Sequence, residues 1–518
     1  MQMTRTWLLL VAVFIAGCAT VEPDPPSQDH AKARAGLADA VTTTDGEANE
    51  PVEDVWQRIR NGYDIPGHEN ARVTAELRQY ARLTDYWARV SERATPYLFH
   101  IVEQVEARDM PLELALLPIV ESGFQPFAYS HGRAAGIWQF VPATGRHYGL
   151  DQNWWYDGRR DVLAATDAAL TYLTYLNEMF DGDWLLALAA YNAGEGTVSR
   201  AIRRNRNAGK PTDYWSLDLP RETMAYVPRL LAISELVAAP GTHGIALTPI
   251  PNQPAVEVVD LDKQIDLALV TELADIDMET LYALNPGFNR WATAPDGPHR
   301  LLLPQARAAD FRTRLAEIPS TDWMRWQRHE IAAGETLGQI ADRYHVTVST
   351  LQEANSLDTH IIRAGGHLMV PMASRPDSAY SRTVSARQTA TQDTQRAGRE
   401  RTNHVVQAGD SFWSIAQRYG VSVRQLARWN NMAPKDVLSV GEQLAVWTDE
   451  PKMQRSTPLE RLQAVTYTVR EGDSLYLIAQ RFGVGVADLR QWNNLREGGY
   501  LQPGQRLEME VDVTAQAN

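Results

Sequence analysis

Cysteine, positive charge and long apolar runs are scarce in this chain of 518 residues. Cys18 is the only cysteine, so no disulfide can join two parts of the chain. Lys and Arg total 50 against 64 Asp and Glu, which gives a net charge of −14 at pH 7. This charge argues against a nucleic-acid partner, because binding a polyanion needs a basic surface. A neutral polymer such as a glycan remains compatible with it.

Metal-binding motifs are also missing. The sequence has no HExxH and no paired His/Cys spacing of the kind that zinc sites use. We therefore expect no metal and no cofactor. The apolar fraction of 44% is enough for true hydrophobic cores. At roughly 100–200 residues per domain, the length predicts three or four domains.

The first 17 residues, MQMTRTWLLLVAVFIAG, have the pattern of a secretory signal peptide. Arg5 supplies a short basic segment, and Trp7–Ala16 supply ten apolar residues that are followed by small ones. A run of that length is too short to cross a bilayer, which takes about 20 residues. The sequence therefore predicts export rather than a membrane span.

Cys18 lies at the expected cleavage position. Residues 15–18 read IAGC and resemble the bacterial lipobox, in which the cysteine is lipidated and becomes the new N-terminus. Ala19 and Thr20 follow instead of Asp, and by resemblance to the sorting rule this implies the outer membrane of a Gram-negative bacterium, on its periplasmic face. The alternative is an ordinary signal peptide with an incidental cysteine. The position of the chain's only cysteine favours lipidation.

The C-terminal part of the chain repeats itself. The copies read HEIAAGETLGQIADRYHVTVSTLQEAN, HVVQAGDSFWSIAQRYGVSVRQLARWNN and YTVREGDSLYLIAQRFGVGVADLRQWNN. A turn glycine and an asparagine lie 21 residues apart in each, as Gly409 and Asn430 do in the second. A short apolar strand follows each copy, so the predicted unit is strand, helix, helix, strand.

These three copies resemble LysM domains, which are βααβ modules that bind glycans containing N-acetylglucosamine. Gly409-Asp410-Ser411, Asn430, Gly441 and Leu444 carry the resemblance in the second copy. The resemblance implies a glycan groove between the first turn and the loop before the last strand, at 432–438 in that copy. A structural repeat without a ligand is the alternative. The implied glycan-binding residues are Gly334, Glu335, Thr336, Gly409, Asp410, Ser411, Phe412, Gly472, Asp473, Ser474 and Leu475.

A fourth, degenerate copy is predicted at 256–304. Its apolar positions align without a gap on those of the first copy, and Asn285 aligns on Asn355. Gln264 replaces the turn glycine, so we expect the fold to be kept and glycan binding to be lost.

Before these modules, residues 52–245 have apolar residues at helical spacing and no convincing strand alternation. The predicted fold class is therefore multidomain, with an all-α domain followed by small α+β modules. The predicted order is signal peptide 1–17, flexible tether 18–51, helical domain 52–245, degenerate module 250–320, LysM modules 327–372, 403–447 and 465–511, and polar linkers 373–402 and 448–464.

Glu121 is the most informative residue of the helical region. It follows a run of apolar residues and precedes Gly123, where a helix that starts near Asp109 and Pro111 is expected to end, with a kink at Pro118. Apolar neighbours and the negative end of the helix dipole both disfavour a carboxylate, so the pKa of Glu121 should be raised. A raised pKa suits a general acid at neutral pH. Taken alone, a helix-end glutamate that points at water would be the simpler reading.

The motifs that follow change this balance. Glu121-Ser122 is followed by GIWQ at 136–139, AYNAG at 190–194 and ETMAYVPRLLA at 222–232. In this order they resemble the goose-lysozyme-like lytic transglycosylases. GIWQ departs from the family's Gly-Leu-Met-Gln at two positions. The resemblance implies that Glu121 is the catalytic acid and then base, and that Ser122, Trp138, Gln139, Tyr191, Asn192 and Tyr226 bind the sugar.

The implied reaction cleaves the β-1,4 bond between N-acetylmuramic acid and N-acetylglucosamine in peptidoglycan and forms a 1,6-anhydro ring. Most glycosidases need two carboxylates, but here the sugar's own hydroxyl and N-acetyl group replace the second one. A goose-type lysozyme, in which Asp157 or Asp161 orients a water, is one alternative. A non-catalytic peptidoglycan-binding protein is another, although the intact Glu121 argues against it.

Overall fold

The computed structural model describes residues 52–344, 346–449, 462–470, 473–482, 484–493, 495 and 501–512. It divides the chain into two units, 1–53 and 54–518. The predicted signal peptide, lipidated Cys18 and tether lie outside the described residues, as does Gly472. Over the described ranges, no helix has both the length and the apolar character that a bilayer span requires.

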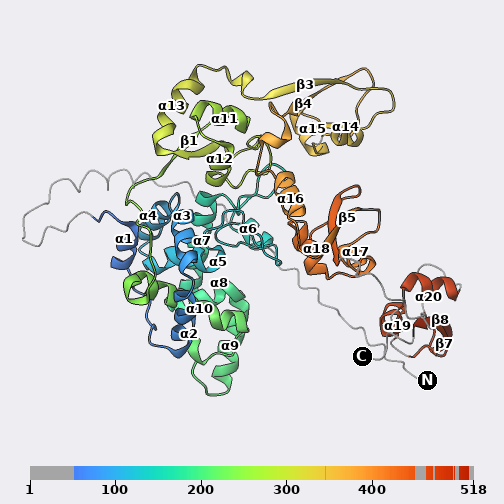
Figure 1. The fold of residues 1–518 in the computed structure, drawn as a ribbon, viewed down its shortest axis with the longest axis horizontal. Helices are drawn as coiled ribbons and strands as arrows, with labels where there is room; N and C mark the ends of the chain where they lie inside the picture. The colour runs from blue at the N-terminus through green and yellow to red at the C-terminus, as the bar shows by residue number, and fades with distance from the viewer. Residues whose placement is uncertain are drawn as a thin grey trace, which may run out of the picture. The chain divides into compact units, whose positions relative to one another are not determined.

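Residues 54–245 form the helical domain (Figure 1), and this stretch, described throughout, contains isolated bridges but no strand. Acidic or amide side chains cap several helices, as Asp161 does by accepting the N–H of Ala164 at 2.9 Å. The long helix α10 packs on α2 and α8 in one large apolar core. The elements are α1 (Val55–Asn61), α2 (Ala71–Ala81), α3 (Thr84–Ala94), α4 (Leu98–Glu106), η2 (Leu112–Leu116), α5 (Leu117–Ser122), α6 (Pro142–His147), α7 (Val162–Met179), α8 (Trp184–Ala193), α9 (Glu195–Asn207), η3 (Tyr214–Ser216), α10 (Arg221–Ala238) and η4 (Pro240–His243).

The predicted helix before Gly123 is divided differently from the expectation. Asp109 has a positive φ of 51° and lies outside any helix, and a 3₁₀ turn, η2, precedes α5. Pro118 stands in the first turn of α5 and does not kink its last turn. A proline is well tolerated there, because a first-turn N–H has no partner within the helix. Gly123 ends α5, as predicted, and adopts the left-handed conformation there.

Four strand-helix-helix-strand units follow, and each has a two-stranded antiparallel sheet (Figure 1). The fourth, degenerate copy is thus confirmed as a fold. Its elements are β1 (Val256–Asp260), α11 (Leu267–Ala274), α12 (Met278–Leu284) and β2 (Arg300–Pro304), extended by α13 (Gln305–Ala316) and η5 (Ser320–Asp322). The three further copies comprise β3 (Arg325–Glu330), α14 (Leu337–Tyr344), α15 (Val348–Ala354), β4 (His367–Met372); β5 (Arg399–Val405), α17 (Phe412–Arg418), α18 (Val423–Trp429), β6 (Gln443–Asp449); and β7 (Leu462–Thr468), α19 (Leu475–Phe482), α20 (Val486–Trp492), β8 (Arg506–Asp512).

The repeated asparagine joins the second helix to the last strand in all four copies. In the second copy, Asn430 donates to the carbonyls of Leu426 and Ala445 and accepts the N–H of Ala445 at 2.7 Å. Asn285, Asn355 and Asn493 make the same three bonds at their own positions. Because buried polar groups need partners, this amide serves the fold of each module.

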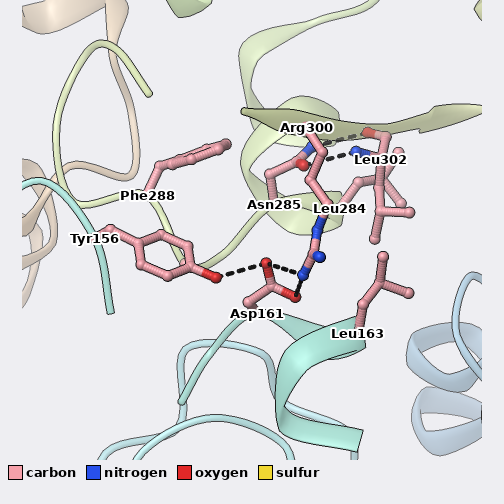
Figure 2. A pocket seen from close by; sticks show the side chains of 9 residues that line it. Tyr156, Asp161, Leu163, Leu284, Asn285, Phe288, Arg300 and Leu302 are labelled. Atoms are coloured by element: carbon pink, nitrogen blue, oxygen red, sulfur yellow. Dashed lines mark hydrogen bonds and ion pairs between the residues drawn. The ribbon is translucent and has the colours of Figure 1, made fainter. Parts of the chain in front are cut away.

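The degenerate copy packs directly on the helical domain. Figure 2 shows the side chain of Asp161 between Tyr156 and Arg300, which approach it at 2.7 and 3.2 Å. Backbone bonds reinforce the contact, since Asp157 donates to the carbonyl of Gly287 at 2.8 Å and Asn289 donates to that of Trp155 at 2.7 Å. The degenerate copy therefore supports the segment that leads into α7.

The segment 373–402, predicted to be a polar linker, is a structured part of the molecule. It forms η6 (Asp377–Ala379) and α16 (Val384–Asp393), and β5 already begins at Arg399. Tyr380 is 1% exposed and donates to Asp266 of the degenerate copy at 2.9 Å. The linker prediction was wrong because it rested on the polar composition of this segment and gave no weight to Tyr380, the one aromatic residue that packs into the core of the degenerate copy.

Candidate active site

Glu121 lines a groove of about 540 Å³ on the helical domain. The groove is bounded by the end of α5, the loop 128–141, the end of α8 and the start of α10. Of the predicted sugar-binding residues, Gln139, Tyr191, Asn192 and Tyr226 line it together with Glu121. Segments more than 100 residues apart in sequence thus meet at one cavity.

The environment of Glu121 favours its protonated form. Burial raises the pKa of this carboxyl from 4.5 to about 7, a hydrogen bond from Tyr226 lowers it, and the nearby charge of Glu222 raises it. Tyr226 is 2% exposed and donates its hydroxyl to Oε1 of Glu121 at 2.5 Å. The same burial, together with Glu121, raises the pKa of Tyr226 well above its usual value, so this hydroxyl keeps its proton. The pair is a positioned acid held by a neutral donor.

Trp138 does not face the groove, which corrects the expectation that it binds sugar. Its side chain is fully buried and donates to Oγ1 of Thr166 at 3.0 Å. Its backbone carbonyl accepts the hydroxyl of Tyr191 at 3.0 Å. The large aromatic therefore fills the core behind the GIWQ loop, where the neighbouring helix α7 leaves room for it.

Ser122 also acts within the protein. Its hydroxyl lies 3.2 Å from the carbonyl of Pro118 and 3.1 Å from that of Ile137. The side chain thus ties the end of α5 to the GIWQ loop and holds Glu121 against it. Ser122 is not among the residues that line the groove.

Gln139 and Asn192 have amide groups fixed by bonds inside the protein. Nε2 of Gln139 donates to the carbonyl of Gly136 at 2.7 Å, which occupies the nitrogen and leaves the amide oxygen for a ligand. Oδ1 of Asn192 accepts the hydroxyl of Thr223 at 2.8 Å, which leaves its amide nitrogen as a donor. Gln139 therefore provides a hydrogen-bond acceptor and Asn192 a hydrogen-bond donor, and both suit the hydroxyls and acetamido groups of a sugar.

Gly136 lets the GIWQ loop lie against the segment that leads into α7. Its φ is +78°, and a Cβ at this position would lie 2.0 Å from the carbonyl oxygen of Arg159. Arg159 in turn donates to the carbonyl of Phe140 at 3.3 Å and binds Asp157 through two nitrogens. No side chain other than hydrogen fits at position 136.

Asp157 and Asp161 are not available to orient a water in the groove, in contrast to the hydrolase alternative. Asp157 is buried against Arg159 and Arg160, whose charges hold the pKa of its carboxyl below the usual value against the effect of burial. Asp161 caps α7 and pairs with Arg300. Both carboxylates hold the loop and the degenerate copy in place.

Glu222 and Arg229 line the groove and were missed by sequence reasoning. Glu222 is exposed in the first turn of α10, and Arg229 lies two turns later, 3.4 Å from Glu76. The spacing of Glu222, Tyr226 and Arg229 at intervals of four and three places them on one helix face. That periodicity around the predicted Tyr226 was the signal that could have found them.

The predicted LysM residues divide into two groups. The acidic side chains serve the modules themselves: Asp410 bonds to His404 and to the N–H of Gln407, both at 2.9 Å, and Glu335 and Asp473 make equivalent contacts. Phe412 is 3% exposed and belongs to the core, so its predicted contact with glycan is wrong for the side chain. Gly334, Thr336, Gly409, Ser411 and Ser474 remain exposed in the first turns, and Leu475 is partly buried.

No cluster of three or more His, Cys, Asp or Glu side chains with metal-site geometry occurs in the part of the chain that the structure describes.

Comparison with known proteins agrees with this arrangement. Residues 100–213 match the family model of the transglycosylase SLT domain, residues 255–320 match the LysM-like domain of lytic transglycosylase MltD, and 329–371, 404–447 and 467–509 match the LysM domain. The chain is 35% identical over 513 residues to membrane-bound lytic murein transglycosylase D of Escherichia coli strain K12, with 97% of each chain covered. The protein of the same name from E. coli O6:H1 matches equally. An autolysin of Enterococcus faecalis is 27% identical over 196 residues, which cover 37% of this chain and 25% of the autolysin.

Proposed function

The chain belongs to the family of membrane-bound lytic murein transglycosylase D and is a lytic transglycosylase with peptidoglycan-binding LysM modules. From this premise we propose the bond that the protein cleaves, the residue that acts as the acid and the place of the protein in the cell. The reaction cleaves the β-1,4 bond between N-acetylmuramic acid and N-acetylglucosamine and leaves a 1,6-anhydromuramoyl end. The observation that carries it is the position of Glu121, a partly buried carboxyl that lines the groove, accepts the hydroxyl of Tyr226 and has a pKa raised to about 7.

Glu121 acts twice in the proposed mechanism. As the protonated acid it gives its proton to the glycosidic oxygen, and the bond from the muramoyl carbon to that oxygen breaks. As the carboxylate it then takes the proton of the muramoyl 6-hydroxyl, whose oxygen closes the anhydro ring. No water is consumed, and Glu121 ends protonated as it began. Tyr226 holds Oε1 of Glu121 throughout, and Gln139, Tyr191 and Asn192 orient the sugar.

A hydrolase of the same fold is a second candidate, because one further carboxylate, Glu222, lines the groove. A group that activates water needs a fixed position, since effective general base catalysis depends on geometry. Glu222 is exposed on the first turn of α10. This exposure favours the lyase, in which the second group is the sugar's own hydroxyl.

We place the protein on the periplasmic face of the outer membrane, held by lipid on Cys18. The support is the signal-peptide pattern, the IAGC motif and the name of the relatives, which describes them as membrane-bound. Two or more acyl chains would give a stable anchor, since each buried methylene contributes about 0.8 kcal/mol. Cys18→Ala should abolish lipid labelling and release the protein from the outer-membrane fraction, and unchanged labelling would disprove the anchor.

Mass spectrometry of muropeptides from purified sacculi tests the reaction. The wild type should release anhydro-muropeptides, each lighter by one water than a lysozyme product, and Glu222→Gln should do the same within about tenfold of the wild-type rate. Reducing muramic acid as the main product, together with loss of turnover in Glu222→Gln, would establish the hydrolase instead.

A further inference from the structure

The second LysM copy contacts the rim of the catalytic groove through one acidic residue. Asp436 lies in the loop between α18 and β6 and accepts the hydroxyl of Tyr129 at 3.0 Å. Nε of Arg133 lies 2.8 Å from the same carboxylate. Tyr129 and Arg133 belong to the loop 128–134 of the helical domain. The Asp436 side chain is 16% exposed and the Arg133 side chain is 43% exposed, so the carboxylate is better shielded from water than the guanidinium.

The loop 128–134, called the rim loop below, lies between the catalytic groove and a second hollow. Ser130 lines both of them. The second hollow has a volume of about 90 Å³ and is also lined by Tyr129, His131, Arg428, Asn431 and Met432. Its walls thus come from both the helical domain and the second copy.

Helix α16 holds the second copy in this place. Gln392 donates to Oδ1 of Asn430 at 2.8 Å and to the carbonyl of Gln443 at 3.0 Å. At the other end of the helix, Val384 donates to the carbonyl of Asn289 at 3.0 Å, and the guanidinium of Arg387 lies 4.9 Å from the ring centre of Phe127. The helix therefore connects the second copy to both the degenerate copy and the helical domain.

We propose that the hollow between the rim loop (128–134) and the second copy is a further subsite for the glycan strand, adjoining the catalytic groove at Ser130. This inference rests on the proposed function, and it goes beyond it by assigning the second copy a place along the substrate being cut. With a volume of about 90 Å³, the hollow has room for a small substituent such as an acetamido group.

The chemistry of the lining fits that group. Arg428 and Asn431 supply N–H donors for an acetamido oxygen, and Met432 offers an apolar surface for its methyl group. The remainder of the sugar would lie across Ser130 toward Glu121. An inhibitory role for the docked copy is disfavoured, because the catalytic groove stays open beside it with its volume of about 540 Å³.

A charge exchange tests this proposal through binding, in the full chain carrying Glu121→Gln so that the strands stay uncut. Arg133→Asp and Asp436→Arg are made singly and together, and Asp tolerates the positive φ of 67° at position 133. Dissociation constants are measured for long glycan strands and for tetrasaccharides that fill only the groove. Arg204→Asp on α9, which breaks an exposed pair between Arg204 and Asp218, is the control.

Each single exchange should weaken the binding of long strands by on the order of tenfold, leave tetrasaccharide binding unchanged, and be reversed in the double variant. Unchanged binding of long strands, tighter binding of tetrasaccharides, or no recovery in the double variant would overturn the subsite. The proposed reaction is judged separately on the wild-type products, so the two can fail independently.

Discussion

At the scale of the residue, the proposed chemistry depends on one partly buried carboxyl group, that of Glu121. Glu121 is destabilising as an anion, because burial outweighs the hydrogen bond from Tyr226 and Glu222 adds like charge. A structural role would favour a paired carboxylate of the kind seen at Asp157, where two arginines hold the pKa down. This contrast supports the proposal that Glu121 reacts and that Asp157 has a supporting role.

Glu121→Gln should abolish turnover, by a factor of 10²–10⁴ or more, because the amide has no proton to give at neutral pH. It should also stabilise the protein above pH 7. The folded pKa is raised from 4.5 to about 7, so the unfolded chain releases its proton first and the wild type loses stability as pH rises between these values. At about 1.4 kcal/mol per pKa unit the loss is on the order of 3 kcal/mol.

Thermal melts of both proteins at pH 4.5 and pH 8 measure this difference. The gap between variant and wild type should open only at the higher pH. A constant gap, or none, would contradict the raised pKa, and near-normal turnover of the variant would place the acid elsewhere.

Tyr226→Phe should move the alkaline limb of kcat/KM to higher pH. The hydrogen bond from Tyr226 lowers the pKa of Glu121, so its loss leaves burial unopposed and raises that pKa further. The pH profile of kcat/KM measures the shift. Tyr191→Phe is the matched control, because Tyr191 donates to the carbonyl of Trp138 instead. A limb that stays in place in Tyr226→Phe, or moves equally in the control, would rule out this coupling.

At the scale of the element, the loop between α5 and α6 is held by backbone contacts as much as by side chains. Gly136 lies against Arg159, Ser122 ties α5 to the carbonyl of Ile137, and Gln139 has a positive φ of 51°. Non-glycine residues in the left-handed conformation, such as Gln139, persist in a loop only where their surroundings fix them. The degenerate copy provides such surroundings by supporting the segment 155–161.

Gly136→Ala should destabilise the helical domain by several kcal/mol and lower turnover, because the new Cβ would lie 2.0 Å from a backbone oxygen that cannot move aside easily. Gly149→Ala separates this clash from backbone strain, since Gly149 has a similar φ of +76° with nothing within 4 Å of a Cβ. The free energy of unfolding of the Gly149→Ala control should fall by only about 1 kcal/mol. Denaturant melts give both values, and equal losses would show that strain alone matters.

At the scale of the whole molecule, the modules are not independent domains joined by flexible linkers, because the core of one module includes residues that follow it in sequence. Trp323 and Tyr380 lie in the core of the degenerate copy although both follow its α13 in sequence. Asp266 is the shared contact point, because it accepts Tyr380 and its own N–H bonds to the carbonyl of Trp323 at 2.9 Å. A module boundary placed at residue 320 would therefore cut through a core.

Truncation after Asp322 should consequently lower the melting temperature, whereas truncation after Thr394 should preserve it. Both should weaken retention on sacculi, by up to ~10²–10⁴ if linked weak binders act through effective concentration. Both should cleave short soluble strands at temperatures where they are folded, since Glu121 and its groove remain. Calorimetry and sacculus pull-down measure the two effects. Equal melting temperatures would show that Trp323 and Tyr380 add nothing to the core.

The sequence predicted a large part of this protein because its signals are local. Helical spacing identified the all-α domain, the 21-residue separation of Gly409 and Asn430 identified the modules, and the gap-free alignment of Asn285 on Asn355 identified the degenerate copy. The apolar run before Glu121 predicted the direction of its pKa shift. These features depend on neighbours along the chain, which a sequence displays directly.

Only the tertiary structure decided which side chains face the groove. Trp138 and Phe412 are buried, Asp157 and Asp161 are committed to arginines, and Glu222 and Arg229 are brought to Glu121 from about 100 residues away. The direction of an aromatic in a loop depends on the space that another helix leaves for it, and the partner of an acid depends on a fold contact. The sequence by itself therefore determined the modules and the candidate acid, Glu121, while packing between distant segments determined the walls of the site and the place of the second copy beside it.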